Sequence, residues 1–323
     1  MLSNNIIGKP IEEANYADIC FYDKVKDNKI IVGSEDFSSD EYPLSRFTPI
    51  GIVAVPSSHT EEGRPRILSL AEMNYNTPDG GSVTSPQSMY FGGYGYTVTD
   101  LPIKQQFPYL SSLTENGTVK YNTDGCFLPS DGYSARTDNP LNSLEGFYKN
   151  YSYSLMCSPY KEDGSKDERY FDTSNTGNVL ADFDGKSNTE KILAEDNSYS
   201  TDWKTATTIS NEGNNQYVHP AAQCCWRFHT DGTKQGDWYL PSAGELGYAF
   251  VRYASINSAI NTLNTQYSTT LGIQFATIKF DTKYYWSSTQ YSSMHAFGID
   301  FDNGWMNVRY KNGPYYVRAF LNI

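Results

Sequence analysis

The chain has 323 residues, enough to bury a substantial core as one large domain or two ordinary ones. Its net charge of −12 argues against nucleic acid and anionic membranes as partners, because both are bound through clustered Lys and Arg. No stretch approaches the roughly 20 apolar residues of a membrane span, and the first residues lack the charged and apolar regions of a secretory signal. We therefore expect no membrane insertion, and either synthesis without an export leader or loss of that leader.

The 27 Tyr, 16 Phe and 5 Trp predict a folded protein, because they supply apolar bulk despite the low mean hydropathy of −0.57. Chains rich in Tyr, Ser and Asn are typical of recognition surfaces, and equally of ordinary β-rich proteins. The 5 cysteines are too few and too scattered to indicate a disulfide framework. Composition alone therefore does not distinguish a recognition protein from an ordinary β-rich protein.

The first 46 residues contain one clear hairpin pattern, in which two β-prone runs flank a polar turn near residues 26–28. We predict an N-terminal β-hairpin arm over residues 1–46, for attachment or oligomerisation. Two buried strands are predicted next, at residues 50–55 and 66–70, joined by a polar loop. They mark the start of the main domain, residues 47–323.

Residues 73–215 are dominated by Gly, Ser, Asn, Asp and Pro with isolated aromatics, and predict a long loop-rich insertion with short strands. Within it, Asp182, Asp184 and Asn188 could hold a calcium ion or form a solvated turn, and their spacing does not match an EF-hand loop. We predict no metal and no required cofactor.

A short buried helix is predicted after this insertion, with Pro220 at its first position and a stop at Asp231-Gly232. Its adjacent Cys224 and Cys225 are interpreted as small buried apolar residues rather than a redox pair.

A second helix begins at a capping box formed by Ser242 and Glu245. Its apolar stripe recurs every three to four residues and comprises Leu246, Phe250, Tyr253 and Ile260.

The pattern near the C-terminus predicts a β-hairpin, because residues 296–302 alternate and Asn303-Gly304 suits a type I′ turn. A two-residue loop pairs Asp302 with Trp305 and Phe301 with Met306. The predicted inward face comprises Phe297, Ile299, Phe301, Met306, Val308 and Tyr310. The predicted outward face comprises Gly298, Asp300, Asp302, Trp305, Asn307 and Arg309.

Trp305 is the anomaly on this outward face. An exposed Trp beside Asp, Asn and Arg is typical of an interface anchor, and the alternative is a Trp that covers a neighbouring loop. The flanking loops add a rim of polar and aromatic residues: Tyr291, Ser292, Ser293, Met294, His295, Lys311, Asn312 and Tyr315.

The segments GDWYLPSAGEL and YYWSSTQYSSMHAFGIDFDNGWMNVRYKNGPYYVRAF, with IGIVAVP and ILSL upstream, resemble the variable proteins of diversity-generating retroelements from gut bacteria and their phages. The resemblance runs from about residue 48 onward and implies a C-type lectin fold of the formylglycine-generating-enzyme type. The predicted fold class is thus α+β, C-type-lectin-like, with two helices, a C-terminal β-hairpin ligand face and a loop-rich insertion.

In such proteins the segment after YWSST is rewritten by mutagenesis at template adenines, usually within Asn codons. The resemblance implies these ligand-binding variable positions: Ser292, Met294, His295, Gly298, Asp300, Asp302, Trp305, Asn307, Val308, Arg309, Tyr310, Asn312, Gly313 and Tyr315. Asn codons alone cannot yield Trp305 or Met294. Val308 and Tyr310 face inward by alternation, and a bulge near Val308 would reconcile the two assignments.

Sequence motifs give no support to an enzyme. Formylglycine-generating enzymes use a cysteine pair in the C-terminal half, whereas the last cysteine here is Cys225. The histidines show no zinc-ligand spacing, and no GxSxG elbow or EPN, QPD or WND lectin motif occurs.

We therefore predict a non-enzymatic protein that binds a protein or glycan on a target cell, located on a phage virion or at a cell surface, with a homotrimer suggested by analogy. One alternative is a formylglycine-generating-enzyme-like or other enzyme acting on a small substrate in a cleft lined by the insertion. Another is a structural fibre or pilus component.

Overall fold

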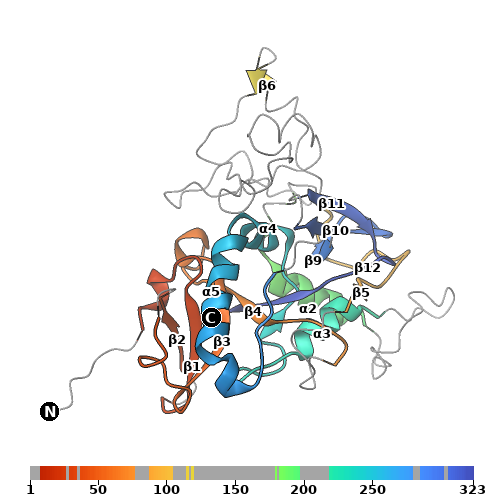
Figure 1. The fold of residues 1–323 in the computed structure, drawn as a ribbon. Helices are drawn as coiled ribbons and strands as arrows, with labels where there is room; N and C mark the ends of the chain where they lie inside the picture. Colours follow the sequence, from red (N-terminus) through yellow and green to blue (C-terminus); the bar gives the residue numbers. More distant parts are fainter. Residues whose placement is uncertain are drawn as a thin grey trace.

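A six-stranded antiparallel sheet lies at the centre of the structure (Figure 1). Its strands, in spatial order, are β2 (Lys29–Gly33), β1 (Ile19–Asp23), β3 (Phe47–Val55), β4 (Arg66–Glu72), β13 (Arg318–Asn322) and β8 (Trp238–Tyr239). The computed structural model describes residues 8–26, 29–34, 37–76, 87–104, 114–115, 118–119, 179, 182–196, 218–278, 284–301 and 305–323. Both strands predicted at the start of the main domain are present, as β3 and β4.

The predicted N-terminal hairpin is present as β1 and β2, but it is not a separate arm. β1 also pairs with β3, from Ile19 opposite Ile52 to Asp23 opposite Phe47. Both faces of β1 are apolar and buried, since Phe21 lies on one side of the sheet and Cys20 on the other. A strand of this kind is stable only with cover on both faces. The described part of residues 8–46 therefore belongs to the main sheet, while its role in attachment or oligomerisation stays a prediction.

A second antiparallel sheet is built from the strands of the C-terminal region, in the order β11 (Trp305–Tyr310), β10 (His295–Asp300) and β9 (Tyr284–Gln290). It joins the first sheet through β9, where the Trp286 amide donates to the Tyr316 carbonyl at 2.9 Å and the Tyr316 amide donates to Tyr284 at 2.8 Å. Two small pairs complete the described strands: β12 (Pro314–Tyr315) with β5 (Met89–Tyr90), and β6 (Thr114–Glu115) with β7 (Thr118–Val119).

The described residues form four α-helices rather than the two predicted: α2 (Gly185–Ala194), α3 (Pro220–Arg227), α4 (Ala243–Val251) and α5 (Tyr253–Leu271). Short 3-10 turns occur at Ile11–Glu13 and Ser57–His59. The first predicted helix is α3, which ends at Arg227, before the predicted stop. Its Cys224 and Cys225 are buried, as predicted, and the Cys224 thiol donates to the Asn74 carbonyl at 3.3 Å. No described helix has the length and apolarity required to cross a membrane.

The second predicted helix is divided into α4 and α5. The capping box is present, with the Ser242 side chain accepting from the Glu245 amide. The helix breaks at Arg252, whose φ of −115° and ψ of 19° are not helical. The apolar stripe continues across this break and is buried throughout. Packing against the sheet, rather than an unbroken helix, therefore preserves the stripe.

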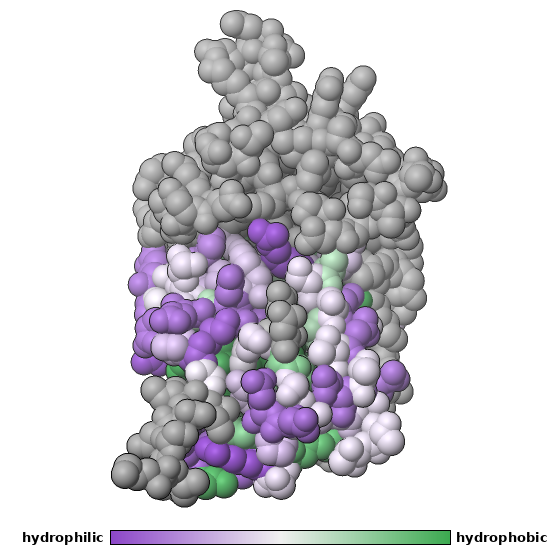
Figure 2. All heavy atoms as spheres, turned by 60° about the vertical axis from the view of Figure 1, so that its left-hand side comes forward, coloured by the Kyte–Doolittle hydropathy of each residue, from purple (hydrophilic) through white to green (hydrophobic). Residues whose placement is uncertain are grey.

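Helices cover both faces of the six-stranded sheet (Figure 1). One core cluster joins α4 and α5 to the face that carries Phe21, Ile52 and Leu68. The other joins α2 and α3 to the face that carries Cys20 and Val53. Mixed α+β architecture, as predicted, follows from this layering. On the side of β1 and β2, most of the coloured surface is hydrophilic and hydrophobic residues are scattered (Figure 2).

Most of the predicted insertion, residues 73–215, lies outside the described residues. Its described parts are not loops alone: they include β5, which pairs with β12, and α2, which packs in the core through the buried Ile192. Cys126 and Cys157 also lie outside the described residues.

Candidate ligand-binding surface

The C-terminal hairpin forms, but its register differs from the prediction by two residues. Asp300 pairs with Trp305, Ile299 with Met306 and Phe297 with Val308. The predicted pairings of Asp302 with Trp305 and of Phe301 with Met306 are therefore wrong. Side chains alternate with a period of two, so this shift leaves each residue on its predicted face.

Phe301 is buried next to the end of β10. Its ring centroid lies 5.1 Å from that of Tyr285 and 5.5 Å from that of Phe250. These edge contacts stabilise the ring in the core between the second sheet and α4. Phe301 therefore keeps its predicted inward position, although it does not pair with Met306.

The predicted inward face is correct for Phe297, Ile299, Phe301 and Met306, which are all buried. It is wrong for Tyr310, which is 55% exposed. Val308 is half-buried against the core. Pairing is continuous through Val308, so the expected bulge is absent there, and the described irregularity lies between Ala296 and Gly298 on the β9 side.

The predicted outward face is largely covered. Gly298 and Asp300 are buried, and the Trp286 ring of β9 lies 3.7 Å from the position of a Cβ atom on Gly298. Asn307 and Arg309 are half-buried, and the Arg309 guanidinium lies 3.7 Å from the centre of the Tyr284 ring. These residues are therefore not a flat solvent-exposed surface.

For two of the predicted contact residues, Asp302 and Trp305, the structure describes no side-chain position. Asp302 lies outside the described residues, and Trp305 is described only by its backbone pairing with Asp300. The role of Trp305 as an interface anchor stays a prediction.

Exposed and half-buried side chains, most of them aromatic, gather instead at the opposite end of the hairpin. The His295 ring is tilted by 38° against the Tyr310 ring, with centroids 4.3 Å apart, and the Tyr291 ring lies 6.3 Å from His295. Tyr291 is 40% exposed and the adjacent Met294 is 42% exposed. We call Tyr291, Met294, His295 and Tyr310 the aromatic cluster. Tyr94, from a distant part of the chain, is half-buried beside this cluster, with its ring 6.3 Å from that of Tyr310.

A polar turn holds the cluster in shape. The Ser292 hydroxyl accepts from the amides of Met294 at 3.2 Å and His295 at 3.1 Å, and it lies 3.1 Å from His295 Nδ1. Burial, with a smaller effect of Lys311, lowers the pKa of His295. His295 is therefore a neutral ring at pH 7, suited to stacking.

The other predicted positions lie at the edge of the hairpin. Asn312 is exposed and Gly313 is half-buried. Tyr315 is half-buried, and its ring packs 4.9 Å from Trp286 and 5.4 Å from Tyr284. Tyr315 thus stabilises the sheet, whereas Asn312 is available to a ligand.

The sequence prediction missed Tyr94. Its only signal is the segment Phe91–Tyr96, where three glycines surround a tyrosine, and nothing in this pattern places it beside residue 310. Hydrogen bonds do so: the Gly95 amide donates to Ser293 at 3.1 Å and the Gly92 amide donates to Lys311 at 3.2 Å.

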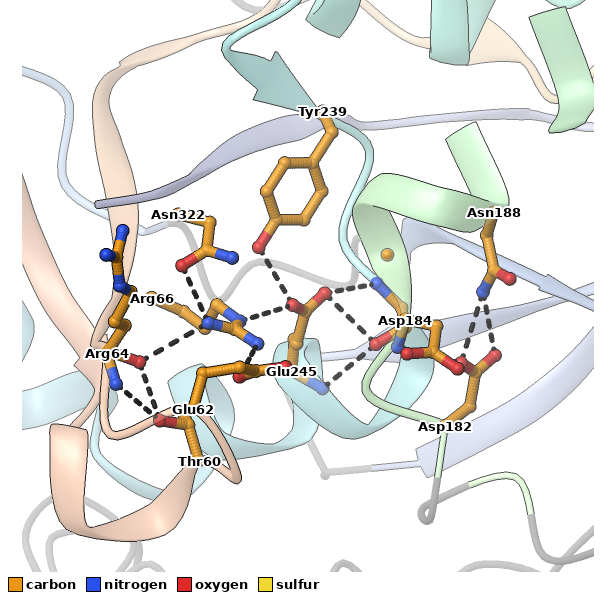
Figure 3. A network of polar contacts seen from close by, with 12 residues as sticks. Thr60, Glu62, Arg64, Arg66, Asp182, Asp184, Asn188, Tyr239, Glu245 and Asn322 are labelled. Atoms are coloured by element: carbon orange, nitrogen blue, oxygen red, sulfur yellow. Dashed lines mark hydrogen bonds and ion pairs between the residues drawn. The ribbon is translucent and has the colours of Figure 1, made fainter. Parts of the chain in front are cut away.

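A second polar cluster lies at the start of α4, and its central residues Arg66, Tyr239 and Glu245 are buried (Figure 3). Glu245 accepts from Tyr239 at 2.8 Å and from Arg66 at 3.2 Å. Burial raises the pKa of Glu245 to about 7, against the opposing effect of Arg66. Arg66 also pairs with Glu62 at 2.9 Å. This network joins β4 to the start of α4, and its burial indicates a structural role.

Asp182 belongs to the same region and is not a solvated residue (Figure 3). Its carboxylate accepts from the Asn188 side chain at 3.0 and 3.1 Å and from Thr289 at 2.6 Å. The expected solvated turn is therefore wrong for Asp182 and Asn188, which are buried. Within the described ranges no group of three or more His, Cys, Asp or Glu side chains could hold a metal ion.

One buried pair resembles a catalytic dyad. His219 Nδ1 lies 2.6 Å from Asp196, whose other oxygen accepts from Gln223 at 2.6 Å. His219 is fully buried, and a Cβ atom on Gly93 would lie only 2.5 Å from its Nε2. This close packing leaves no room for a substrate at Nε2 in the described structure.

Comparison with known proteins gives a family-model match to the C-terminal part and a distant structural match to nearly the whole chain. No curated protein matches the chain significantly. A fimbrial protein from Bacteroides ovatus aligns over 96% of this chain and 49% of its own length, with 14% identity and a TM-score of 0.37. The chain thus spans about half of that protein. Residues 192–320 match the model of the Lcl C-terminal domain, a family associated with lectin-like proteins and retroelement-diversified variable proteins.

Proposed function

We propose that this protein is a non-enzymatic binding protein, and that the aromatic cluster contacts a protein on the surface of a target cell. The observation that carries this proposal is the exposure of Tyr310 at the end of β11 and of Tyr291 and Met294 in the hydrogen-bonded turn between β9 and β10, around His295. Rigid, exposed tyrosines supply contact area at a low cost in conformational entropy. The cluster is therefore prepared for binding before a ligand arrives.

A protein ligand suits this surface better than a glycan. Tyr and Met are enriched in the centres of protein interfaces, where they exclude water from the contact. Met294 offers a flexible apolar side chain with no hydrogen-bond donor, which is of little use for ordering sugar hydroxyls. A glycan ligand is the alternative that the experiment below distinguishes.

We propose further that the protein is a variable protein of a diversity-generating retroelement with a C-type-lectin-like fold, displayed on a phage virion or a cell surface. The match of residues 192–320 supports this assignment. Homotrimeric display would raise avidity without any new contact at a single site. A near-identical template repeat of the coding region for residues 285–320, beside a reverse transcriptase gene, is the expected genomic finding, and its absence contradicts this assignment.

The absence of catalysis is also part of the proposal. In the described part of the chain, the clusters of catalytic residue types around Glu245 and around His219 are buried and bonded to protein groups. Catalytic groups must reach a substrate, and these lie against the core instead.

Binding to intact cells tests this function. Fluorescent protein is added to a panel of bacterial and epithelial cells, untreated, shaved with protease, or oxidised with periodate. The double variant Tyr310→Ala/Met294→Ala is expected to bind at least tenfold more weakly than the unmodified protein. Ile273→Ala is the matched control, because Ile273 is 46% exposed in the loop after α5.

Loss of binding after protease treatment supports a protein ligand. Loss of binding only after periodate treatment indicates a glycan ligand in place of a protein ligand. Full binding by the double variant, with near-ultraviolet circular dichroism unchanged, contradicts the role of the aromatic cluster.

A further inference from the structure

We propose that residues 91–104 form a second half of the ligand-binding surface, in which Tyr94 contacts the ligand and Lys311 positions Tyr94 beside Tyr310. This inference rests on the proposed function and extends it to a segment far from the hairpin in sequence. No part of the predicted hairpin face includes Tyr94.

Backbone hydrogen bonds attach this segment to the hairpin at several points. Besides the contacts of Gly92 and Gly95, the Lys104 amide donates to the Gln290 carbonyl at 3.0 Å. Ile103 forms a parallel bridge with Gln290. The Val98 amide donates to the Gln290 side chain at 3.0 Å. The segment therefore follows the edge of β9 as an ordered part of the surface.

Glycines permit the close approach that places Tyr94. A Cβ atom on Gly92 would lie 2.0 Å from the Val218 carbonyl oxygen, and the residue has a φ of +97°. Gly93 and Gly95 also have positive φ, at 60° and 86°. Only glycine adopts such conformations readily. The segment is thus confined between the start of α3 and the hairpin, and the Tyr94 ring is directed to Tyr310.

Lys311 is the side chain that joins the two halves. It is fully buried, and its Nζ donates to the Tyr96 carbonyl at 2.7 Å and to Gln290 Oε1 at 2.9 Å. Among the described residues no carboxylate pairs with it. An ammonium group without a counter-charge is costly to bury. The two hydrogen bonds of the Lys311 amine, one to the segment and one to β9, offset part of this cost.

Burial lowers the pKa of Lys311 to about 7. The titratable group that faces it from β10 is His295, whose own pKa is lowered. On the segment, the Tyr96 hydroxyl donates to Glu195 at 2.9 Å, at the end of α2. Docking of the segment disfavours the protonated amine, which in an undocked segment would keep its usual pKa of 10.5. Docking is therefore strengthened as the pH rises from about 7 toward 10, and weakened as it falls to 7.

The experiment compares Tyr94→Ala and Lys311→Met with Ile273→Ala, a control that is 46% exposed in the loop after α5, outside both halves of the surface. Cells bound by the unmodified protein serve as the probe. We expect at least fivefold weaker binding for Tyr94→Ala and Lys311→Met, a change of less than twofold for Ile273→Ala, and unchanged near-ultraviolet circular dichroism for Tyr94→Ala.

Hydrogen exchange supplies a readout independent of the ligand. In the unmodified protein, protection of the Gly92, Gly95 and Val98 amides, corrected for intrinsic exchange, should increase by up to about tenfold per pH unit between pH 7 and 9. Lys311→Met should remove this dependence. The positioning role of Lys311 is overturned if Lys311→Met keeps the pH dependence of amide protection.

The outcomes separate the two proposals. If Tyr310→Ala loses binding and Tyr94→Ala keeps it, the inference fails while the proposed function stands. If both variants bind as well as the unmodified protein, or if the unmodified protein binds no cell, the proposed function fails and the inference fails with it.

Discussion

Glu245 shows how one residue can serve both a helix and a sheet. Its backbone and side chain complete the capping box with Ser242, and the same carboxylate accepts from Arg66 on β4 and from Tyr239 on β8 (Figure 3). The capping box was predicted from the sequence, because its residues are three apart. The partners on the sheet are 6 and 179 residues away, so sequence reasoning could not find them.

The raised pKa of Glu245 makes a pH-dependent contribution to stability. A carboxyl whose pKa is higher in the folded state, here about 7 against 4.5, contributes stability that is fully present below pH 4.5 and is lost as the pH rises through 7. The shift of about 2.5 pH units corresponds to at most about 3.5 kcal/mol, at about 1.4 kcal/mol per pH unit. Gln in this position keeps the capping box but does not titrate.

We therefore expect the free energy of unfolding of Glu245→Gln to decrease less between pH 5 and pH 7.5 than that of the unmodified protein. Urea titrations of both proteins at the two pH values measure this difference, and contributions from other groups cancel. Equal changes in both proteins would show that Glu245 is ionised throughout this range.

At the scale of single elements, strand β10 determines which predicted positions can vary. Gly298 is buried in the middle strand, and a Cβ atom there would lie 3.0 Å from the Tyr285 carbonyl oxygen. Asn312 is exposed in the turn after β11. Both positions belong to the predicted variable set, yet only Asn312 has room for a larger side chain.

We expect Gly298→Leu to lower the free energy of unfolding by about 1–3 kcal/mol or more, because overpacking displaces the backbone of β9. Asn312→Leu, the matched control, should change it by less than about 0.5 kcal/mol. Thermal unfolding followed by circular dichroism measures both. Equal melting temperatures would mean that the sheet adjusts to a side chain at residue 298.

Local patterns predicted the elements better than their pairing. The alternation of residues 296–302 correctly assigned the buried Phe297, Ile299 and Phe301, because facing depends only on a period of two. The register was predicted from the Asn303-Gly304 pair alone, and the observed pairing of Asp300 with Trp305 shows that this local signal does not decide it. Tyr94 was missed because it reaches Tyr310 only through tertiary contacts between distant parts of the chain.

At the scale of the whole molecule, the N-terminal hairpin is part of the core. We expect deletion of residues 1–33 to prevent folding, since it removes β1 and exposes the edge of β3 along its apolar residues. Loss of near-ultraviolet circular dichroism and binding of a hydrophobic dye would report this. A shortened protein that keeps a cooperative melting transition would instead support the predicted separate arm.

The position of β13 has a consequence for biosynthesis. This strand follows the hairpin in the chain, yet it lies between β4 and β8 in the central sheet, with Phe320 opposite both Leu68 and Tyr239. The sheet can therefore close only after the ribosome has translated the whole hairpin and the strand beyond it. A nonsense codon or frameshift within the hairpin leaves β4 with an open edge, and such a chain becomes a substrate for cellular proteases. Synthesis thus selects chains in which the reading frame through the hairpin is intact.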